Sequence, residues 1–211
     1  MKTCVPTEIR SLERLITDLV YKCRAEISTI FDDFLVYVIH GFSPGEKNLE
    51  NWKYGKEEAA MFYQMYVKWI QIMNVQVDAL GWYDVLGELY MSCIAGNARK
   101  NSNGQFFTPC HICDFMAEVC DSPGKTGDIC SDPACGSGRN LLAWHVKHLS
   151  TYLCAEDVDR TCCLMTVCNF IIHGCVGEVI WHDSLRPETF YDGWKVNEAL
   201  AVTGLPTVRR I

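Results

Sequence analysis

The first hundred residues carry apolar side chains at the spacing of amphipathic helices. Large apolar residues recur every three or four positions, as they do on the buried face of a helix. The stretches with this pattern are 9–20, 31–39, 59–77 and 80–95. The turn residues Phe42-Ser-Pro-Gly45 break the second stretch. The pattern therefore predicts a helical N-terminal domain over residues 1–100.

Beyond residue 100 the pattern changes to short apolar runs that alternate with helical stretches. Runs typical of strands cover 127–131, 152–159 and 178–181, and helical patterns cover 140–148 and 161–173. Strands that alternate with helices are typical of a parallel sheet with helices packed on it. An apolar run that begins at Ala199 is the candidate for a fourth strand. The sequence thus predicts an α/β domain over residues 101–211.

Composition excludes several classes of protein. The 211 residues are enough to bury a sizeable core, and no segment approaches the run of about 18 apolar residues typical of a membrane-spanning helix. The N-terminal residues lack the apolar core of a signal peptide, so we expect a cytoplasmic protein. The thirteen cysteines are then expected to be reduced. Cys110-His-Ile-Cys113 has metal-ligand spacing but lacks a clear second pair, so we predict no metal site.

The charge of the chain bears on its partners. The formal net charge is −7, and the longest basic run is Arg209-Arg210. Proteins that bind DNA on their own normally present a basic face, because neutralising phosphates supplies much of the affinity. We therefore expect weak DNA binding by the chain alone.

Two motifs carry the most chemical information. Gly104-Gln-Phe-Phe-Thr-Pro109 precedes Asp132-Pro-Ala-Cys-Gly-Ser-Gly138, and the second motif lies between the 127–131 strand and the 140–148 helix. A strand that runs into a small-residue turn and then a helix presents backbone N–H groups to a charged ligand. Gly136 and Gly138 let the backbone turn sharply and let a ligand approach it. The spacing is neither that of a dinucleotide fingerprint nor that of a Walker loop.

Together these motifs resemble the N6-adenine-specific DNA methyltransferases, in particular the modification subunit of type I restriction-modification systems. The resemblance runs from about Leu86 to Leu185 and includes His182-Asp-Ser-Leu185, which is similar to the segment that contacts the adenine ring. It implies a Rossmann-like α/β methyltransferase fold and S-adenosylmethionine as the cofactor. By position, it implies cofactor contacts from Gln105, Phe106, Phe107, Thr108, Pro109, Asp132, Pro133, Ala134, Gly136, Gly138, Asp157 and Asp183.

The acid that would bind the cofactor ribose has two candidates. The family's second strand ends in an acidic residue that accepts hydrogen bonds from both ribose hydroxyls, and such a carboxylate is common in nucleotide-binding α/β folds. We align Asp157 with it, because Val158-Asp159 then matches the family's following Ile-Asp. Glu156 is the alternative.

The family's catalytic motif is missing. Members carry an Asn-Pro-Pro-aromatic stretch after a fourth strand, where it holds the exocyclic amine of an extruded adenine. No such stretch occurs in the 211 residues. The nearest candidate by position is Val202-Thr-Gly-Leu-Pro206, in which Thr203 is able to accept a hydrogen bond. The catalytic residues are therefore unknown, and it is uncertain whether this chain methylates adenine by itself.

The sheet is also expected to be truncated. The resemblance implies further strands on the other side of the first strand, and the chain offers at most one more before Ile211. The strand that holds Ile129 would then have a bare edge, which exposes unpaired backbone groups. Either another chain, in a homo-oligomer or with a partner, completes the sheet, or residues 193–211 fold back over the edge.

Two functions follow from these observations. The first is a DNA adenine-N6 methyltransferase-family protein that binds S-adenosylmethionine within a restriction-modification-type system and reaches DNA through a specificity subunit. The second is a catalytically inactive cofactor-binding module with a regulatory or anti-restriction role. A third hypothesis is a small-molecule or protein methyltransferase, since cofactor motifs do not specify which molecule accepts the methyl group.

Overall fold

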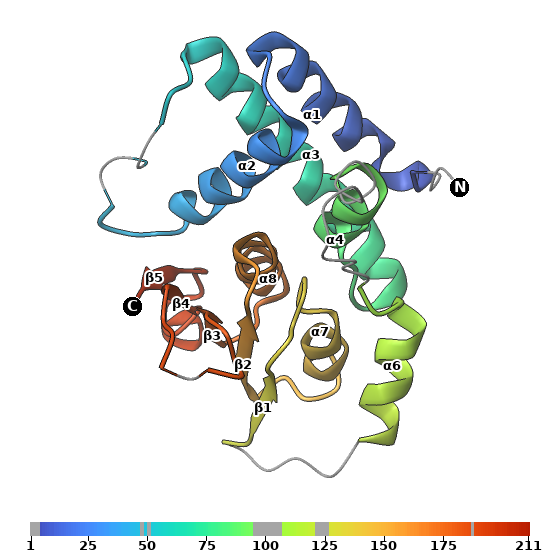
Figure 1. Cartoon of the computed structure of the whole chain (residues 1–211). Coiled ribbons are helices and arrows are strands. Elements are labelled where there is room, and N and C mark those ends of the chain that lie inside the picture. Colours follow the sequence, from blue (N-terminus) through green and yellow to red (C-terminus); the bar gives the residue numbers. More distant parts are fainter. Residues whose placement is uncertain (1–4, 47–48, 50–51, 95–106, 121–126, 187) are drawn as a thin grey trace. The chain divides into compact units, whose positions relative to one another are not determined.

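The computed structural model describes residues 5–46, 49, 52–94, 107–120, 127–186 and 188–211 (Figure 1). The chain divides into two compact units. The first comprises Met1–Val38 and Lys47–Phe106, and the second comprises Ile39–Glu46 and Phe107–Ile211. The domain boundary that the sequence predicts at residue 100 lies outside the described residues and stays a prediction.

The first unit is helical, as predicted. Its regular elements are η1 (Thr7–Ile9), α1 (Arg10–Cys23), most of α2 (Ile27–Gly41), α3 (Lys56–Leu80), α4 (Val85–Leu89) and the π-helical turn η2 (Tyr90–Ile94). The periodic face of α1 buries Leu12, Ile16 and Leu19, and α1 packs against α3. Phe62 and Trp69 of α3 are fully buried in this core. The apolar spacing alone therefore predicted which faces are buried.

The expected helix over 80–95 begins later than predicted. Gly81 ends α3 with a φ of 85°, and its N–H donates to the carbonyl oxygen of Val77. The next helix starts only at Val85, because the Asp84 carboxylate accepts a hydrogen bond from the Gly87 N–H at 2.8 Å and so caps α4. A glycine stop followed by an aspartate cap therefore separates α3 from α4.

The second unit is a mixed α/β structure with a five-stranded sheet. The strands are β1 (Ile129–Asp132), β2 (Tyr152–Asp157), β3 (Gly177–Trp181), β4 (Asp192–Val196) and β5 (Val208–Arg210), in the order β1-β2-β3-β4-β5. The first three strands are parallel to one another. β4 pairs antiparallel with β3, and β5 pairs antiparallel with β4. The helices are α6 (Cys110–Val119), α7 (Arg139–His145), α8 (Arg160–His173) and α9 (Leu200–Thr203).

Helix α8 is the centre of this unit. Every residue from Cys162 to Ile171 is buried, and α8 packs on β2, β3 and β4. Asp159 caps its start by accepting from the Cys162 N–H at 3.1 Å, and Gly174 ends it in the left-handed conformation. Two successive crossovers in the same direction put α7 and α8 on one face of the sheet, where they touch. Within the described ranges, no helix is long and apolar enough to cross a membrane.

Three expectations about the C-terminal residues are wrong. Two strands, β4 and β5, follow β3, whereas at most one was expected. The run from Ala199 is not a strand, because residues 200–203 form α9. Residues 193–211 do not cover β1 either, because β4 pairs with β3 and β5 pairs with β4, at the opposite end of the sheet. β1 is therefore an edge strand among the described residues, and 67% of Ile129 is exposed.

Asn197, directly after β4, explains why the chain turns there. It adopts a φ of 60°, and its side chain is fully buried. The amide donates to the carbonyl oxygens of Phe170 at 3.1 Å and Cys175 at 2.9 Å, and its oxygen accepts from the Thr207 N–H at 3.2 Å. Asn197 thus joins the end of α8 to the β4–β5 connection.

Candidate functional site

The loop between β1 and α7 has a constrained backbone. Gly136 and Gly138 have φ values of 56° and 86°, a region that side chains other than glycine rarely adopt. A Cβ atom on Gly136 would lie 3.0 Å from the Phe107 ring, and one on Gly138 would lie 3.1 Å from Cγ2 of Thr166. Both glycines are needed for conformation and for space.

Helix α8 holds this loop from one side. The Thr166 hydroxyl donates to the Gly136 carbonyl oxygen at 2.9 Å, and the Asn169 amide donates to the Ser137 carbonyl oxygen at 2.8 Å. Both side chains are fully buried. Sequence reasoning missed Thr166. The available signal was the presence of polar residues on a helix that is otherwise apolar.

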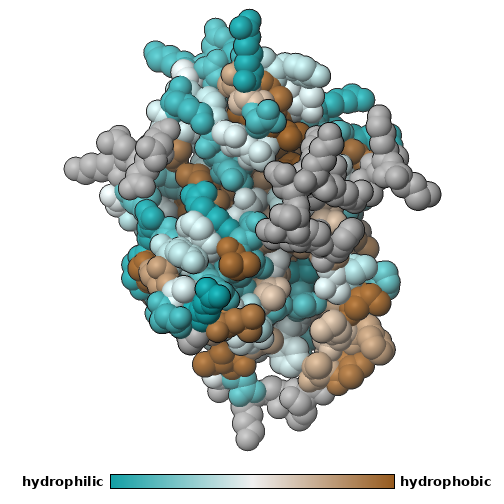
Figure 2. All heavy atoms as spheres, in the orientation of Figure 1, coloured by the Kyte–Doolittle hydropathy of each residue, from teal (hydrophilic) through white to brown (hydrophobic). Residues whose placement is uncertain are grey.

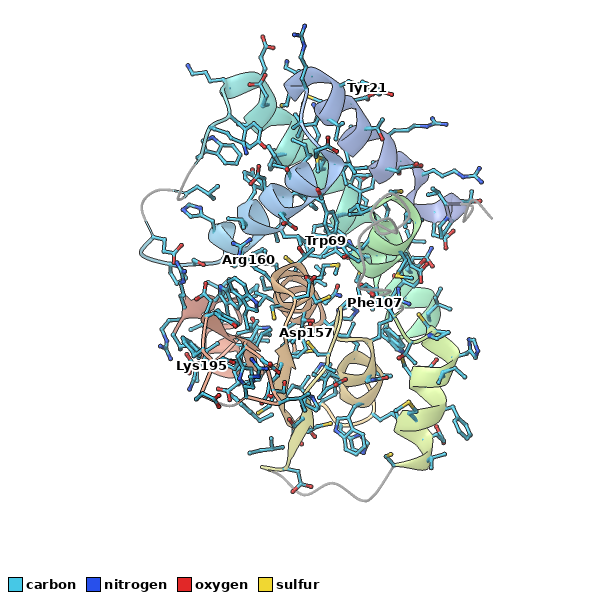
Figure 3. The ribbon with its side chains drawn as sticks, viewed as in Figure 1. Tyr21, Trp69, Phe107, Asp157, Arg160 and Lys195 are labelled. Atoms are coloured by element: carbon cyan, nitrogen blue, oxygen red, sulfur yellow. The ribbon has the colours of Figure 1, made fainter. Side chains whose placement is uncertain are left out.

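Asp157 closes the loop from the carboxyl end of β2. Its Oδ2 accepts from the Gly136 N–H and its Oδ1 from the Asp159 N–H, both at 2.8 Å. Burial raises the pKa of this carboxyl above its ordinary value, and the two N–H donors oppose that rise. Figure 3 labels Asp157 beside the loop and Phe107 near it.

Glu156 points away from this loop. Successive residues of a strand face opposite sides of the sheet. Glu156 accordingly faces His182, whose Nε2 lies 3.0 Å from the Glu156 Oε2. Of the two acids at the end of β2, Asp157 is the one that faces the glycines.

Asp132 supports the start of the loop. Its Oδ1 accepts from the Ala134 N–H at 3.1 Å, and its Oδ2 accepts from the Asn140 amide at 3.2 Å. Pro133 and Ala134 are exposed on the outer side of the turn. The Pro133 carbonyl oxygen accepts from the Ser184 hydroxyl at 2.7 Å, which ties the segment after β3 to the same loop.

The segment before α6 covers the loop from the other side. The Phe107 ring lies against Gly136, and the Thr108 carbonyl oxygen accepts from the Arg139 Nη1 at 3.3 Å. Pro109 stands at the N-cap of α6. Gln105 and Phe106, the other two predicted cofactor contacts in this motif, lie outside the described residues.

Asp183 lies on the segment tied to the loop, but its carboxylate turns onto its own backbone. Oδ1 accepts from the Leu185 N–H at 3.0 Å, and Oδ2 lies 3.7 Å from the Arg186 Nε. About 30% of the side chain is exposed. Asp183 is therefore near the glycine loop, and it is less buried than Asp157.

No metal centre is evident in the described parts of the chain, where no three His, Cys, Asp or Glu side chains converge. Cys113 is buried and donates weakly to the Thr108 carbonyl oxygen, with the sulfur 3.7 Å from that oxygen. Its role in this structure is to pack α6 beneath the 107–109 segment.

These features define an α/β domain in which a glycine loop, an acid at the end of the next strand and a covering aromatic segment form one candidate ligand site. Residues 82–203 match the family model of the N-6 DNA Methylase family. The chain belongs to this family, as its motifs predicted, and the family uses S-adenosylmethionine.

Individual relatives agree with this assignment. The chain is 29% identical to the type I restriction enzyme MjaIX methylase subunit of Methanocaldococcus jannaschii over 120 residues, which are 52% of this chain and 21% of the relative. It is 27% identical to the MjaVIII methylase subunit of the same organism over 96 residues, 44% of this chain and 16% of the relative. The chain therefore spans about a fifth of the length of these relatives.

A solved structure is also similar. The methyltransferase subunit of a type I restriction-modification system from Streptococcus thermophilus aligns over 83% of this chain and 38% of its own length. The TM-score is 0.36 and the sequence identity is 17%.

Proposed function

We propose that this chain binds S-adenosylmethionine on the 132–138 loop and acts in adenine-N6 DNA methylation of the restriction-modification type. The observation that carries the proposal is the junction between Asp157 and Gly136, where a buried carboxylate at a strand end meets the left-handed glycine turn. In nucleotide-binding α/β folds, such an acid accepts the ribose hydroxyls and such a turn admits the rest of the ligand. The fold is then a Rossmann-like methyltransferase domain with a truncated sheet.

The residues present fit this cofactor. A carboxylate has about four acceptor positions, and Asp157 uses one on each oxygen for a backbone N–H, so acceptor capacity remains for ribose hydroxyls. Phe107 supplies an apolar surface over Gly136, in the space that a Cβ atom of that residue would fill. Asp132 supports the turn by accepting from the Ala134 N–H. Asp183 lies on the segment after β3, where it would contact the adenine ring.

Methyl transfer by the chain alone is a separate question. A delocalised exocyclic amine needs strong acceptors before it becomes nucleophilic, and the Asn-Pro-Pro-aromatic stretch that supplies them is missing from the 211 residues. Thr203, the nearest candidate, uses its hydroxyl locally, donating to the Ala199 carbonyl oxygen at 2.9 Å and accepting from the Leu205 N–H at 3.1 Å. Asn197 is committed to three backbone groups. We therefore expect no methyl transfer by the isolated chain, an outcome that the alternative, a catalytically inactive cofactor-binding regulatory module, also predicts.

Two measurements test the function. We expect isothermal titration of the purified chain with S-adenosylhomocysteine to give saturable heat. We also expect no transfer of tritium from labelled S-adenosylmethionine to adenine-containing duplex DNA by the chain alone. Absence of heat at millimolar ligand would contradict cofactor binding. Tritium incorporation above background would contradict the regulatory alternative and establish an adenine methyltransferase.

Partners follow from the surface of the second unit. The curated relatives are named as subunits of type I restriction enzymes, and we propose that this chain likewise works in an assembly that contacts DNA through a separate subunit. The position of β1 at the edge of the sheet formed by the described residues supports this, because a strand edge is a site for pairing with another chain. Helix α6 also presents an exposed apolar stripe, seen as brown surface over that helix in Figure 2. The stripe consists of Ile112, Phe115, Met116 and Val119.

A further inference from the structure

Helix α6 has two unlike faces. It packs against α7, and its buried residues are Cys113 and Ala117. Figure 1 shows α6 on the side of α7 that points away from the sheet. The other face is the apolar stripe defined above, whose residues Ile112, Phe115, Met116 and Val119 are exposed to 39%, 64%, 44% and 66%. Isolated exposed apolar residues are ordinary, but four on one face of a helix mark an interaction surface.

The area of the stripe sets the strength of the contact that it can make. At these exposures the four side chains present on the order of 350 Å² of accessible surface, comparable with the largest apolar patch on many monomers, which is often functional. Two copies of the stripe placed face to face, with their flanking residues, bury roughly 1,000 Å², the smallest area of a specific interface. A contact of this size is weak and reversible.

The stripe matches itself under a two-fold rotation. Ile112 and Val119 are equally far in sequence from the midpoint between Phe115 and Met116. An antiparallel pair of α6 helices therefore sets Ile112 of one copy against Val119 of the other, with the two Phe115 rings together at the centre. Aromatic residues at the centre of an interface carry much of its binding energy.

Polar residues beside the stripe favour the same orientation. His111 and Glu118 are seven positions apart, so both lie on one flank of the stripe, and both are exposed. In an antiparallel pair the His111 imidazole of one copy faces the Glu118 carboxylate of the other, whereas a parallel pair would place like groups together. Glu118 also pairs with Lys147 of its own chain, and a carboxylate has enough acceptor positions for both donors.

We infer that α6 is a homodimer interface, in which a second copy of this chain covers the stripe in antiparallel orientation. The surface differs from the edge of β1, where another chain would extend the sheet. The inference does not depend on cofactor binding, because no residue of the stripe belongs to the proposed ligand site.

The oligomeric state of the full chain tests the inference. We expect sedimentation velocity between about 1 and 200 µM to show a monomer that converts reversibly to a dimer, the behaviour of a small interface. A reductant must be present, because Cys120 at the end of α6 is exposed and can form a disulfide between copies. Phe115→Glu should raise the dimer dissociation constant by about thirty-fold or more, as for the loss of a central aromatic anchor.

Two further variants separate a specific interface from non-specific association. Tyr21→Glu alters an aromatic residue of α1 that is 78% exposed, and it should leave the dissociation constant unchanged. His111→Lys should lower the dissociation constant roughly two- to tenfold, because a permanent cation would then face Glu118 of the other copy. Circular dichroism of each variant checks the fold.

The outcomes are distinct. A monomer at every concentration, or a dimer that Phe115→Glu leaves intact, would overturn the inference. Equal weakening by Tyr21→Glu would show non-specific association and overturn it as well, and weakening by His111→Lys would overturn the antiparallel orientation. Reversible dimerisation that Phe115→Glu abolishes, Tyr21→Glu leaves unchanged and His111→Lys strengthens supports the inference. None of these results decides whether the chain binds S-adenosylhomocysteine, so the proposed function is tested separately.

Discussion

Replacing Gly177 with alanine is expected to lower the free energy of unfolding by about 3 kcal/mol, the upper part of the usual range for overpacking. Gly177 is the first residue of β3 and pairs with Leu153 of β2. A Cβ atom on Gly177 would lie 2.1 Å from the Leu153 carbonyl oxygen and 3.0 Å from its Cβ. The obstacle is backbone in a parallel ladder, so relief requires moving two strands apart.

Chemical denaturation followed by circular dichroism measures this loss. Gly41→Ala is the matched control, because a Cβ atom there meets nothing within 4 Å and its φ is not positive. The control should leave stability unchanged or raise it by less than about 1 kcal/mol. A loss below about 1 kcal/mol for Gly177→Ala would contradict the prediction. It would mean that the backbones of β2 and β3 move apart at a lower cost in free energy than the close contact with Leu153 implies.

Replacing Asp157 with alanine is expected to weaken binding of S-adenosylhomocysteine by about 1.5–3 kcal/mol, the scale of hydrogen bonds to charged groups. The change removes the proposed acceptor for ribose hydroxyls and also the acceptor that holds the Gly136 N–H at 2.8 Å. Isothermal titration measures the affinity, and circular dichroism shows whether the variant remains folded.

Glu156→Ala is the control for Asp157→Ala. Glu156 is the neighbouring acid, and its carboxylate pairs with His182 rather than with the glycine loop. Its loss should change the affinity by less than about 0.5 kcal/mol, as expected for a surface change away from the ligand. If Glu156→Ala weakens binding and Asp157→Ala does not, Glu156 is the ribose acid and our alignment is shifted by one residue.

Much of the local structure was predictable because it depends on neighbours in the sequence. The apolar spacing in α1 is a property of one helix and correctly indicated its buried face. The strand–turn–helix order around Gly136 and Gly138 could be predicted from the sequence. Glycine adopts left-handed backbone conformations readily and has no Cβ atom to clash with closely packed neighbours. The family resemblance came from the same short motifs and is confirmed by the match over residues 82–203.

The end of the chain could not be predicted in the same way. Residues 199–202 are apolar and suit a strand or a helix equally, and short apolar runs do not distinguish the two. Just before them, the Asn197 side chain holds the chain in place by bonding to Phe170, Cys175 and Thr207. Those partners are 10 to 27 positions away in sequence, so no local pattern indicates them.

The sequence by itself determined the helical first unit, the three parallel strands, the glycine loop and the family, because each depends on side-chain periodicity or on a contiguous motif. Tertiary structure alone decided that residues 192–211 extend the sheet beyond β3 and leave β1 at the edge. It also decided that Asp157 faces Gly136 while Glu156 faces His182. In the same way it decided that Thr166 contacts the loop and that Arg139 contacts Thr108 in the segment that covers it. Strand pairing and the meeting of distant side chains depend on packing across the whole unit, and a linear pattern does not contain that information.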